Sequence, residues 1–577
     1  MNRGSSALRH LGKLLLLLWG SNVCANAEPY DLLIQGGLVF DGLGNPPQHA
    51  DVGIRGDRIV AVGQLREHAA ATRLDANGLT VAPGFINMLS WAQPSLLVDG
   101  RGMSDLKQGV TLQVFGEGDS LAPITAAEAQ RLQDPEVYPT NHGRPPWRTF
   151  AEMLRYYELH GVAANVASMV GATTVRRYVL GDANRAATPD ELKTMQSLVD
   201  DAMRQGAMGV GAALIYAPGT FANTAELKAL NQVAARYDGL YTVHLRSEGD
   251  RLLQAIDEFL DIVHTTGVRG EIYHLKASGQ QNWPRLAEAI HRLEAARAAG
   301  VPVSANMYTY TAGSTGLDAA MPPWAQAGGT AAWIERLQDP TQRVAILQAM
   351  RDPAPAWENL MQHAGAEGML LVGFDNPDLQ PLTGMTLAAA AAQRGEDPFT
   401  TAMNLVIENG KDVSVVYQLM SAANLRRKLA TPWISFGSDA RALATEPTFM
   451  QRSTHPRAYG NFARLLGRFV RDEQVLSLTE AIRRLTSLPA TRLRLQSRGQ
   501  IRPGYFADLV MFDAARINDL ATYDSPHQYA EGVQHVIVNG TVALRAGTPT
   551  GALPGRALFG PGYQAGAQAP LRKPQQN

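Results

Sequence analysis

The sequence has a single cysteine in 577 residues, Cys24. It lies in an N-terminal segment typical of an export signal: basic residues precede the apolar run from Leu14 to Trp19, and Ala25-Asn26-Ala27 offers a small-x-small cleavage site. A lipid anchor at Cys24 is the alternative, but the residues before it match a lipidation box poorly. We expect residues 1–27 to be removed. The exported chain would then have neither disulfides nor thiolate metal ligands, which suits a periplasmic or secreted protein.

Long hydrophobic runs and an excess of either charge are also missing. The apolar run in the export signal is too short to span a bilayer. A net charge of -1 provides neither a basic surface for nucleic acid nor a polybasic membrane anchor. The sequence therefore predicts a soluble globular protein whose partner is a small molecule or peptide, and it leaves the oligomeric state open.

Both ends of the chain have a residue pattern typical of β-strands. Alternating apolar residues, interrupted by glycine and Asn-Pro turns, fill residues 28–80, and a similar pattern returns over residues 491–560. We expect these two flanks to assemble into one small β-sandwich. Residues 561–577 form a tail.

The long centre, residues 81–490, alternates helical patterns with short apolar runs, which is typical of βα units. Eight runs qualify as strands: Phe85–Ser90, Thr111–Phe115, Ala164–Val170, Met208–Ile215, Leu240–His244, Glu271–His274, Val303–Tyr308 and Trp433–Ser438. Eight such units predict an α/β fold of the (β/α)8 or TIM-barrel type. Residues 311–430 are far more than one unit needs, so we expect an inserted subdomain over the barrel mouth.

Active sites of such barrels lie at the carboxyl ends of the strands. Four suitable side chains occur there: Glu117, His244, His274 and Asp439. Each alone has a structural explanation, since a strand-end histidine is often only hydrogen-bonded and an aspartate after Gly-Ser is often a helix cap. Together, two imidazoles and a carboxylate make a three-ligand set with an open position for water, as zinc uses in catalysis. A further carboxylate could then move protons.

At these motifs the chain resembles the amidohydrolase superfamily, and within it the N-acyl-D-amino-acid deacylases, or D-aminoacylases. The resemblance spans nearly all of the mature chain. Its supports are Val81-Ala82-Pro83-Gly84-Phe85-Ile86, Gly206-Ala207-Met208-Gly209, Tyr216-Ala217-Pro218-Gly219, Val243-His244-Leu245-Arg246-Ser247-Glu248, Tyr308-Thr309-Tyr310-Thr311-Ala312-Gly313-Ser314-Thr315 and Gly437-Ser438-Asp439.

The resemblance implies that Glu117, His244 and His274 hold one zinc ion and that Asp439 is the general base and acid. The family usually has a cysteine within Gly-Asn-Cys-Gly where this chain has Glu117 within Gly-Glu-Gly-Asp. A carboxylate keeps one negative charge on the metal but is a harder ligand. Asp119 is the alternative ligand, or a residue that hydrogen-bonds one.

The family's His-x-His metal pair, expected after Ala82-Pro83-Gly84-Phe85-Ile86-Asn87, is missing. Met88 and Ser90 stand in its place. A further family histidine is replaced within Gly171-Ala172-Thr173. The remaining residues are expected to hold a single metal ion.

By the same resemblance, four residues bind the substrate's α-carboxylate: Lys276, Tyr308, Ser314 and Arg457. An arginine can clamp a carboxylate with two hydrogen bonds, and a lysine attracts it as a point charge. The alternative is that Lys276 and Arg457 are solvated surface charges. Arg246 and Glu248 are expected to form an ion pair, and His455 to be structural.

The predicted reaction is hydrolysis of a linear amide bond by metal-activated water, with an N-acyl-D-amino acid as substrate. The D-configuration rests on the resemblance alone. Three alternatives stay open: a cyclic-amide hydrolase of the hydantoinase kind, a peptidase for D-residue peptides, and a periplasmic binding protein that has kept the barrel without its chemistry. The acyl group, the preferred side chain and the metal's identity are not readable from the sequence.

Overall fold

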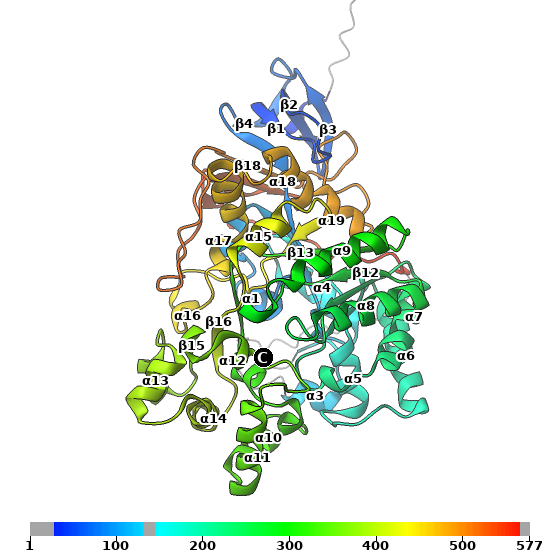
Figure 1. Ribbon diagram of the computed structural model, residues 1–577. Coiled ribbons are helices and arrows are strands. Elements are labelled where there is room, and N and C mark those ends of the chain that lie inside the picture. The colour runs from blue at the N-terminus through cyan, green and yellow to red at the C-terminus, as the bar shows by residue number, and fades with distance from the viewer. Residues whose placement is uncertain (1–27, 132–144, 566–577) are drawn as a thin grey trace, which may run out of the picture.

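Eight parallel strands form a closed barrel in the computed structural model. The structure describes residues 28–131 and 145–565 (Figure 1). The strands are β6 (Phe85–Asn87), β7 (Val110–Phe115), β8 with its continuation β9 (Asn165–Ser168, Val170–Gly171), β10 (Gly209–Ala213), β11 (Leu240–His244), β12 (Arg269–Ile272), β13 (Val303–Met307) and β17 (Ile434–Phe436). They pair in the orders β6-β7-β8 and β9-β10-β11-β12-β13-β17. A hydrogen bond from Met88 N to Phe436 O joins β6 to β17 and closes the ring. The predicted (β/α)8 barrel is confirmed.

Helices surround this barrel. They are α1 (Gln93–Val98), α2 (Met103–Leu106), α3 (Ala126–Arg131), α4 (Phe150–His160), α5 (Ala172–Leu180), α6 (Pro189–Arg204), α7 (Thr224–Ala235), α8 (Leu252–Thr266), α9 (Arg285–Ala298), α16 (Pro447–Met450), α17 (Arg457–Arg464), α18 (Leu478–Leu485) and α19 (Ser487–Arg492). Helix α8 illustrates why these segments are helical and pack on the barrel. Its apolar residues Leu252, Ile256 and Phe259 share one face, and that face is buried. The helix ends at Gly267, whose φ of 72° is a left-handed conformation that glycine adopts without strain.

The two ends of the chain meet in one nine-stranded sheet, at the top of Figure 1. Its strands are β1 (Tyr30–Val39), β2 (Gln48–Arg55), β3 (Arg58–Gly63), β4 (Ala70–Asp75), β5 (Thr80–Pro83), β18 (Leu509–Phe512), β19 (Val533–Val538), β20 (Thr541–Arg545) and β21 (Thr548–Pro549). Strand β5 runs antiparallel to β18, which joins the N-terminal and C-terminal parts. The prediction of a β module built from both ends is confirmed, and β5 leads directly into barrel strand β6.

A second small sheet lies between β13 and β17. Strands β14 (Ala312–Gly316), β16 (Ser414–Gln418) and β15 (Met369–Gly373) pair in that order, all antiparallel. The segment also contains α10 (Thr330–Gln338), α11 (Pro340–Arg351), α12 (Leu360–Ala364), α13 (Leu387–Arg394), α14 (Pro398–Asn409) and α15 (Ala422–Leu429). Their apolar side chains form a core of their own, which includes Trp333 and Met369 and also Tyr308 from the end of β13. The segment therefore packs directly on the carboxyl end of the barrel.

The predicted export signal, residues 1–27, and most of the predicted tail lie outside the described residues. Within residues 28–131 and 145–565, no helix is both long enough and apolar enough to cross a membrane.

Candidate metal and catalytic site

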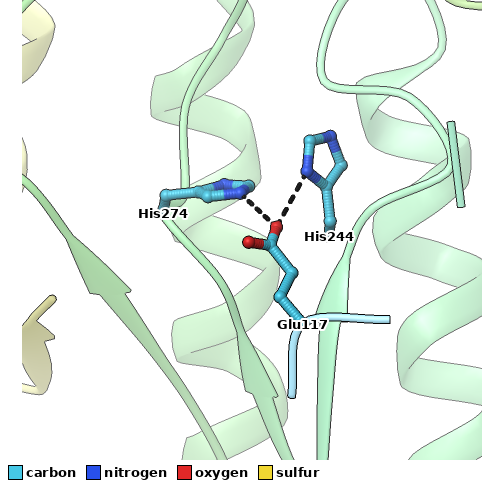
Figure 2. Close-up of side chains that lie close together, drawn as sticks. All are labelled: Glu117, His244 and His274. Carbon is cyan, nitrogen blue, oxygen red and sulfur yellow. Dashed lines mark hydrogen bonds and ion pairs between the residues drawn. The ribbon is translucent and has the colours of Figure 1, made fainter. Parts of the chain in front are cut away.

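Glu117, His244 and His274 converge at the carboxyl end of the barrel. Glu117 follows β7, His244 is the last residue of β11, and His274 follows β12. Glu117 Oε1 lies 3.1 Å from His244 Nδ1 and 2.8 Å from His274 Nε2 (Figure 2). One ligand atom from each residue lies within 4.8 Å of the others, and all three side chains are buried. The structure thus brings the predicted ligand set together.

The backbone is strained at two of the predicted site residues, His274 and Asp439. His274 has a φ of 33° and Asp439 a φ of 51°, which are left-handed conformations rarely adopted by residues with a Cβ. Glu117 follows Gly116, whose φ is 102° and where an added Cβ would lie 2.5 Å from Met169 O. Such strain persists only where the surrounding structure enforces it, and it concentrates at functional sites.

The carboxylates around the two histidines favour positive charge at this position. Burial raises the pKa of Glu117, but the two histidines outweigh it and hold that pKa well below its usual range. Burial and the Lys276 charge lower the pKa of His274, yet nearby carboxylates outweigh both and raise it to about 9. Two imidazole nitrogens and a carboxylate oxygen are ligands that zinc accepts. In this buried position the trio fits a divalent metal ion.

Asp439 stands beside the trio, held by one ion pair and one hydrogen bond. Its Oδ2 lies 2.7 Å from Arg457 Nη1, and its Oδ1 accepts a hydrogen bond of 3.2 Å from Trp91 Nε1. Burial raises the pKa of Asp439; Arg457 opposes that shift, and the Glu117 charge adds to it. A carboxylate with a raised pKa next to a metal site can accept a proton and return it near neutral pH.

A hydrogen-bond network fixes the backbone that leads to Asp439. Asn87 Oδ1 accepts from Ser438 N at 2.8 Å, and Asn87 Nδ2 donates to Ser438 Oγ at 2.8 Å. Asn87 Nδ2 also donates to Asp105 Oδ2 at 3.1 Å. All of these residues are buried, so strands β6 and β17 are locked together one residue before Asp439.

Glu248 lies behind the two histidines. Its carboxylate is 3.0 Å from His274 Nδ1 and 3.4 Å from His244 Nε2, the nitrogens that face away from Glu117. Lys276 Nζ donates to both Glu248 oxygens, at 2.6 and 2.7 Å, and lies 2.7 Å from His274 Nδ1. This carboxylate therefore pairs with His274 and lies within ion-pair distance of His244, although His244 Nε2 has no hydrogen-bond partner among the described residues. Carboxylates placed behind metal-binding histidines commonly orient them.

The residues predicted to bind the substrate's carboxylate are spread over this mouth. The guanidinium of Arg457 lies 4.6 Å above the ring of Tyr308 and donates to Ser314 O at 3.3 Å. Ser314 Oγ donates to Val415 O. Tyr308 Oη is buried and has no hydrogen-bond partner among the residues that the structure describes. Lys276 is buried against Glu248, so it is not a surface charge, and its contact with substrate stays a prediction.

The structure also shows the contacts of three further residues discussed in the sequence analysis: Asp119, Arg246 and His455. Asp119 is paired with Arg177 at 2.9 Å and is not a member of the metal trio. The predicted Arg246–Glu248 ion pair is wrong: Arg246 instead pairs with Glu258 of α8 at 2.9 Å, because it lies on the side of the loop that faces that helix. His455 accepts from Arg457 N and contacts Ala312 O through Nε2, which is a structural role.

Three site residues were missed from the sequence: Trp91, Glu248 as the partner of the histidines, and Tyr216, whose ring packs edge-on against His244 at 5.4 Å. Each had a signal. Trp91 directly follows the Met88 and Ser90 positions, and Glu248 lies four residues after His244.

A buried pair of histidines with a carboxylate, next to an aspartate after the last strand of a (β/α)8 barrel, defines a metal-dependent hydrolase site. Comparison with known proteins agrees with that class. The sequence model of the amidohydrolase family matches residues 146–544. The chain belongs to the amidohydrolase family.

Three relatives are informative. A D-aminoacylase of Alcaligenes xylosoxydans xylosoxydans is 33% identical over 535 residues, which cover 92% of this chain and 98% of that enzyme. A solved D-aminoacylase, studied for one-metal activation and second-metal attenuation of its binuclear metal centre, is 31% identical with a TM-score of 0.77, over 92% of this chain and 100% of its own. An N-acyl-D-glutamate deacylase of Bordetella bronchiseptica, solved with zinc and a phosphonate mimic of the tetrahedral intermediate, is 29% identical with a TM-score of 0.76 over the same shares.

Proposed function

We propose that this chain is a metal-dependent deacylase of N-acyl-D-amino acids, with one zinc ion held by Glu117, His244 and His274. The observation that carries the proposal is the convergence of these three ligands within 4.8 Å beside Asp439. The activities of the D-aminoacylase and the N-acyl-D-glutamate deacylase to which it is similar support the same substrate class.

Asp439 is the proposed proton carrier. Held by Glu117, His244 and His274, a zinc ion would lower the pKa of a water toward about 7 and would polarise the scissile carbonyl. Asp439 takes the proton of the attacking water and then gives it to the departing amine, so one carboxylate serves as base and acid. The buried position of Asp439, which raises its pKa, favours this exchange.

Arg457 is the proposed anchor for the substrate's α-carboxylate, assisted by Tyr308, Ser314 and Lys276. The unpartnered Tyr308 Oη and the guanidinium above its ring face the same region as Asp439. A cation that fixes the α-carboxylate determines which face of the acyl carbonyl meets the water. Selectivity between D and L substrates follows from that orientation.

We place the enzyme in the periplasm or outside the cell. The support is the export signal in residues 1–27 and the absence of cysteine after Cys24. N-terminal sequencing of the protein recovered from outside the cytoplasm tests this, and an N-terminus at Glu28 is the expected result.

The deciding experiment measures release of free amino acid from N-acetyl-D- and N-acetyl-L-amino acids by the purified mature chain. We expect release from the D series, loss with a chelator and recovery with zinc. Asp439→Asn should lose at least about 1,000-fold in kcat. Asp261→Asn, at an exposed aspartate paired with Lys228, is the matched control and should retain activity.

Further substrates separate the alternatives. Release from D-residue dipeptides only would favour a peptidase, and opening of a D-hydantoin only would favour a cyclic-amide hydrolase. Tight binding of an acylated amino acid without turnover by the zinc-loaded chain would favour a binding protein. Activity that survives in Asp439→Asn would contradict the proposed mechanism.

A further inference from the structure

The end of strand β6 offers no side chain to a second metal ion. Met88 is fully buried and packs in an apolar cluster inside the barrel with Leu112 and Val114. Ser90 Oγ is engaged twice, since it donates to Gln113 Oε1 at 2.6 Å and accepts from the backbone N of Ala92 at 3.1 Å. Both side chains are thus engaged in contacts other than with the metal trio.

The residue that does reach the site from this strand end is Trp91. Its backbone N donates to Ala440 O at 3.0 Å, which places the residue beside the loop carrying Asp439. Its indole Nε1–H is shared between two carboxylates, at 2.9 Å from Glu117 Oε2 and 3.2 Å from Asp439 Oδ1. The indole is thus the donor that joins the predicted metal ligand to the predicted base.

The carboxylates of Glu117 and Asp439 share this one donor, and like charges so placed repel each other. In two-metal hydrolases a second cation can offset such charges. Here Arg457 pairs with Asp439 Oδ2, and the neutral indole N–H lies between Asp439 Oδ1 and Glu117 Oε2. The N–H satisfies one oxygen of each carboxylate and leaves Glu117 Oε1 facing the two histidines.

We propose that Trp91 takes the place of the second metal ion: its indole N–H bridges Glu117 and Asp439, positions both carboxylates, and restricts the site to one ion. Trp91 is a positioning residue, because it contacts the base and a ligand and no reacting atom. The inference rests on the proposed metal site and deepens it. It distinguishes this chain from the D-aminoacylase whose binuclear centre shows second-metal attenuation.

The test counts metal ions. Metal-free mature chain is dialysed against increasing zinc and then against zinc-free buffer, and bound zinc per chain is measured by mass spectrometry. The variant Trp91→Phe keeps the ring and removes the N–H. The matched control is Trp433→Phe, because Trp433 also donates its indole N–H to a carboxylate, Glu294 Oε1 at 3.4 Å, at the opposite end of β17.

We expect the wild type and Trp433→Phe to stop at one zinc per chain, with activity that stays flat as zinc rises further. Trp91→Phe should take up additional zinc, lose activity at high zinc, and show a kcat about tenfold lower at low zinc with KM nearly unchanged. Circular dichroism confirms that each variant is folded.

Three results would overturn the inference: a second retained zinc in the wild type, attenuation of the wild type by excess zinc, or identical zinc uptake by Trp91→Phe and Trp433→Phe. The measurements on the wild type can overturn the inference even if Trp91→Phe does not fold. The zinc count does not depend on the substrate, so a chain that deacylates nothing in the assay still confirms or overturns the role of Trp91.

Discussion

Arg457 and Asp439 form an ion pair of 2.7 Å at the mouth of the barrel, with the Arg457 side chain only 4% exposed. The cation proposed to hold the substrate's carboxylate is therefore the same cation that holds the base. Substrate binding and base orientation are coupled through one guanidinium, which also lies over the Tyr308 ring.

Arg457→Met tests this coupling. Removing one partner of a buried charge pair costs roughly 2–5 kcal/mol, so kcat/KM for an N-acetyl-D-amino acid should fall by about 30-fold or more. Both KM and kcat should change, because the substrate loses its anchor and Asp439 loses its partner. Arg464→Met on the same helix is the control: Arg464 pairs with Asp519 and lies 4.6 Å above the Tyr310 ring. A variant with unchanged KM would mean that Arg457 does not contact the substrate.

Glu117→Ala should lose most of its bound zinc, because it removes one of three ligands. Asp119→Ala should keep it, since Asp119 is paired with Arg177 and its side chain is 46% exposed. Zinc per chain, measured after dialysis of both variants, decides between the two carboxylates. Stoichiometric zinc in Glu117→Ala would show that the ligand set is assigned wrongly.

The metal trio was predictable from the sequence because the barrel imposes the geometry. Once eight parallel strands are recognised, residues such as His244 and Glu117 at strand ends must meet at one edge, however far apart they lie in the chain. The positions of the strand ends can be read from the sequence, and closure of the barrel brings the residues at those ends close together.

The contacts around the trio were not predictable in the same way. Arg246 and Glu248 lie two residues apart, and the sequence suggested that they pair with each other. Their partners, Glu258 and Lys276, come from different units of the barrel. Which side of a loop faces the site depends on helix packing, and neither spacing nor composition specifies it.

Glu248→Gln should weaken zinc binding by about 10- to 100-fold, the usual cost of removing a carboxylate that orients metal-binding histidines. The amide keeps the shape of the side chain but can no longer compensate Lys276, to which Glu248 is bonded through both oxygens. Competition with a chelator of known affinity measures the change. Glu258→Gln, at a glutamate paired with Arg246 away from the trio, should bind zinc as the wild type does.

Asp105 should make the stability of the chain fall as pH rises. Burial raises the pKa of Asp105 from 3.8 to about 7, with only Asn87 opposing the shift. Its Oδ1 has no hydrogen-bond partner among the residues that the structure describes. Between pH 4 and 7 the folded chain holds a proton here that the unfolded chain has lost, so this group stabilises the fold at low pH and its contribution disappears above about pH 7.

Asp105→Asn removes the charge while its amide oxygen can still accept from Asn87, so the variant should gain stability relative to the wild type as pH rises from 5 to 8. The full shift corresponds to about 4 kcal/mol, of which about 3 kcal/mol falls between pH 5 and pH 8, an upper bound that relaxation of the site will reduce. Urea unfolding of zinc-loaded wild type and variant at both pH values measures the difference. The exposed Asp261→Asn control should show no such gain. If the advantage of Asp105→Asn is the same at pH 5 and pH 8, Asp105 does not titrate in this window, and the network that joins Asn87 to Ser438 is held by a carboxylate already ionised at pH 5.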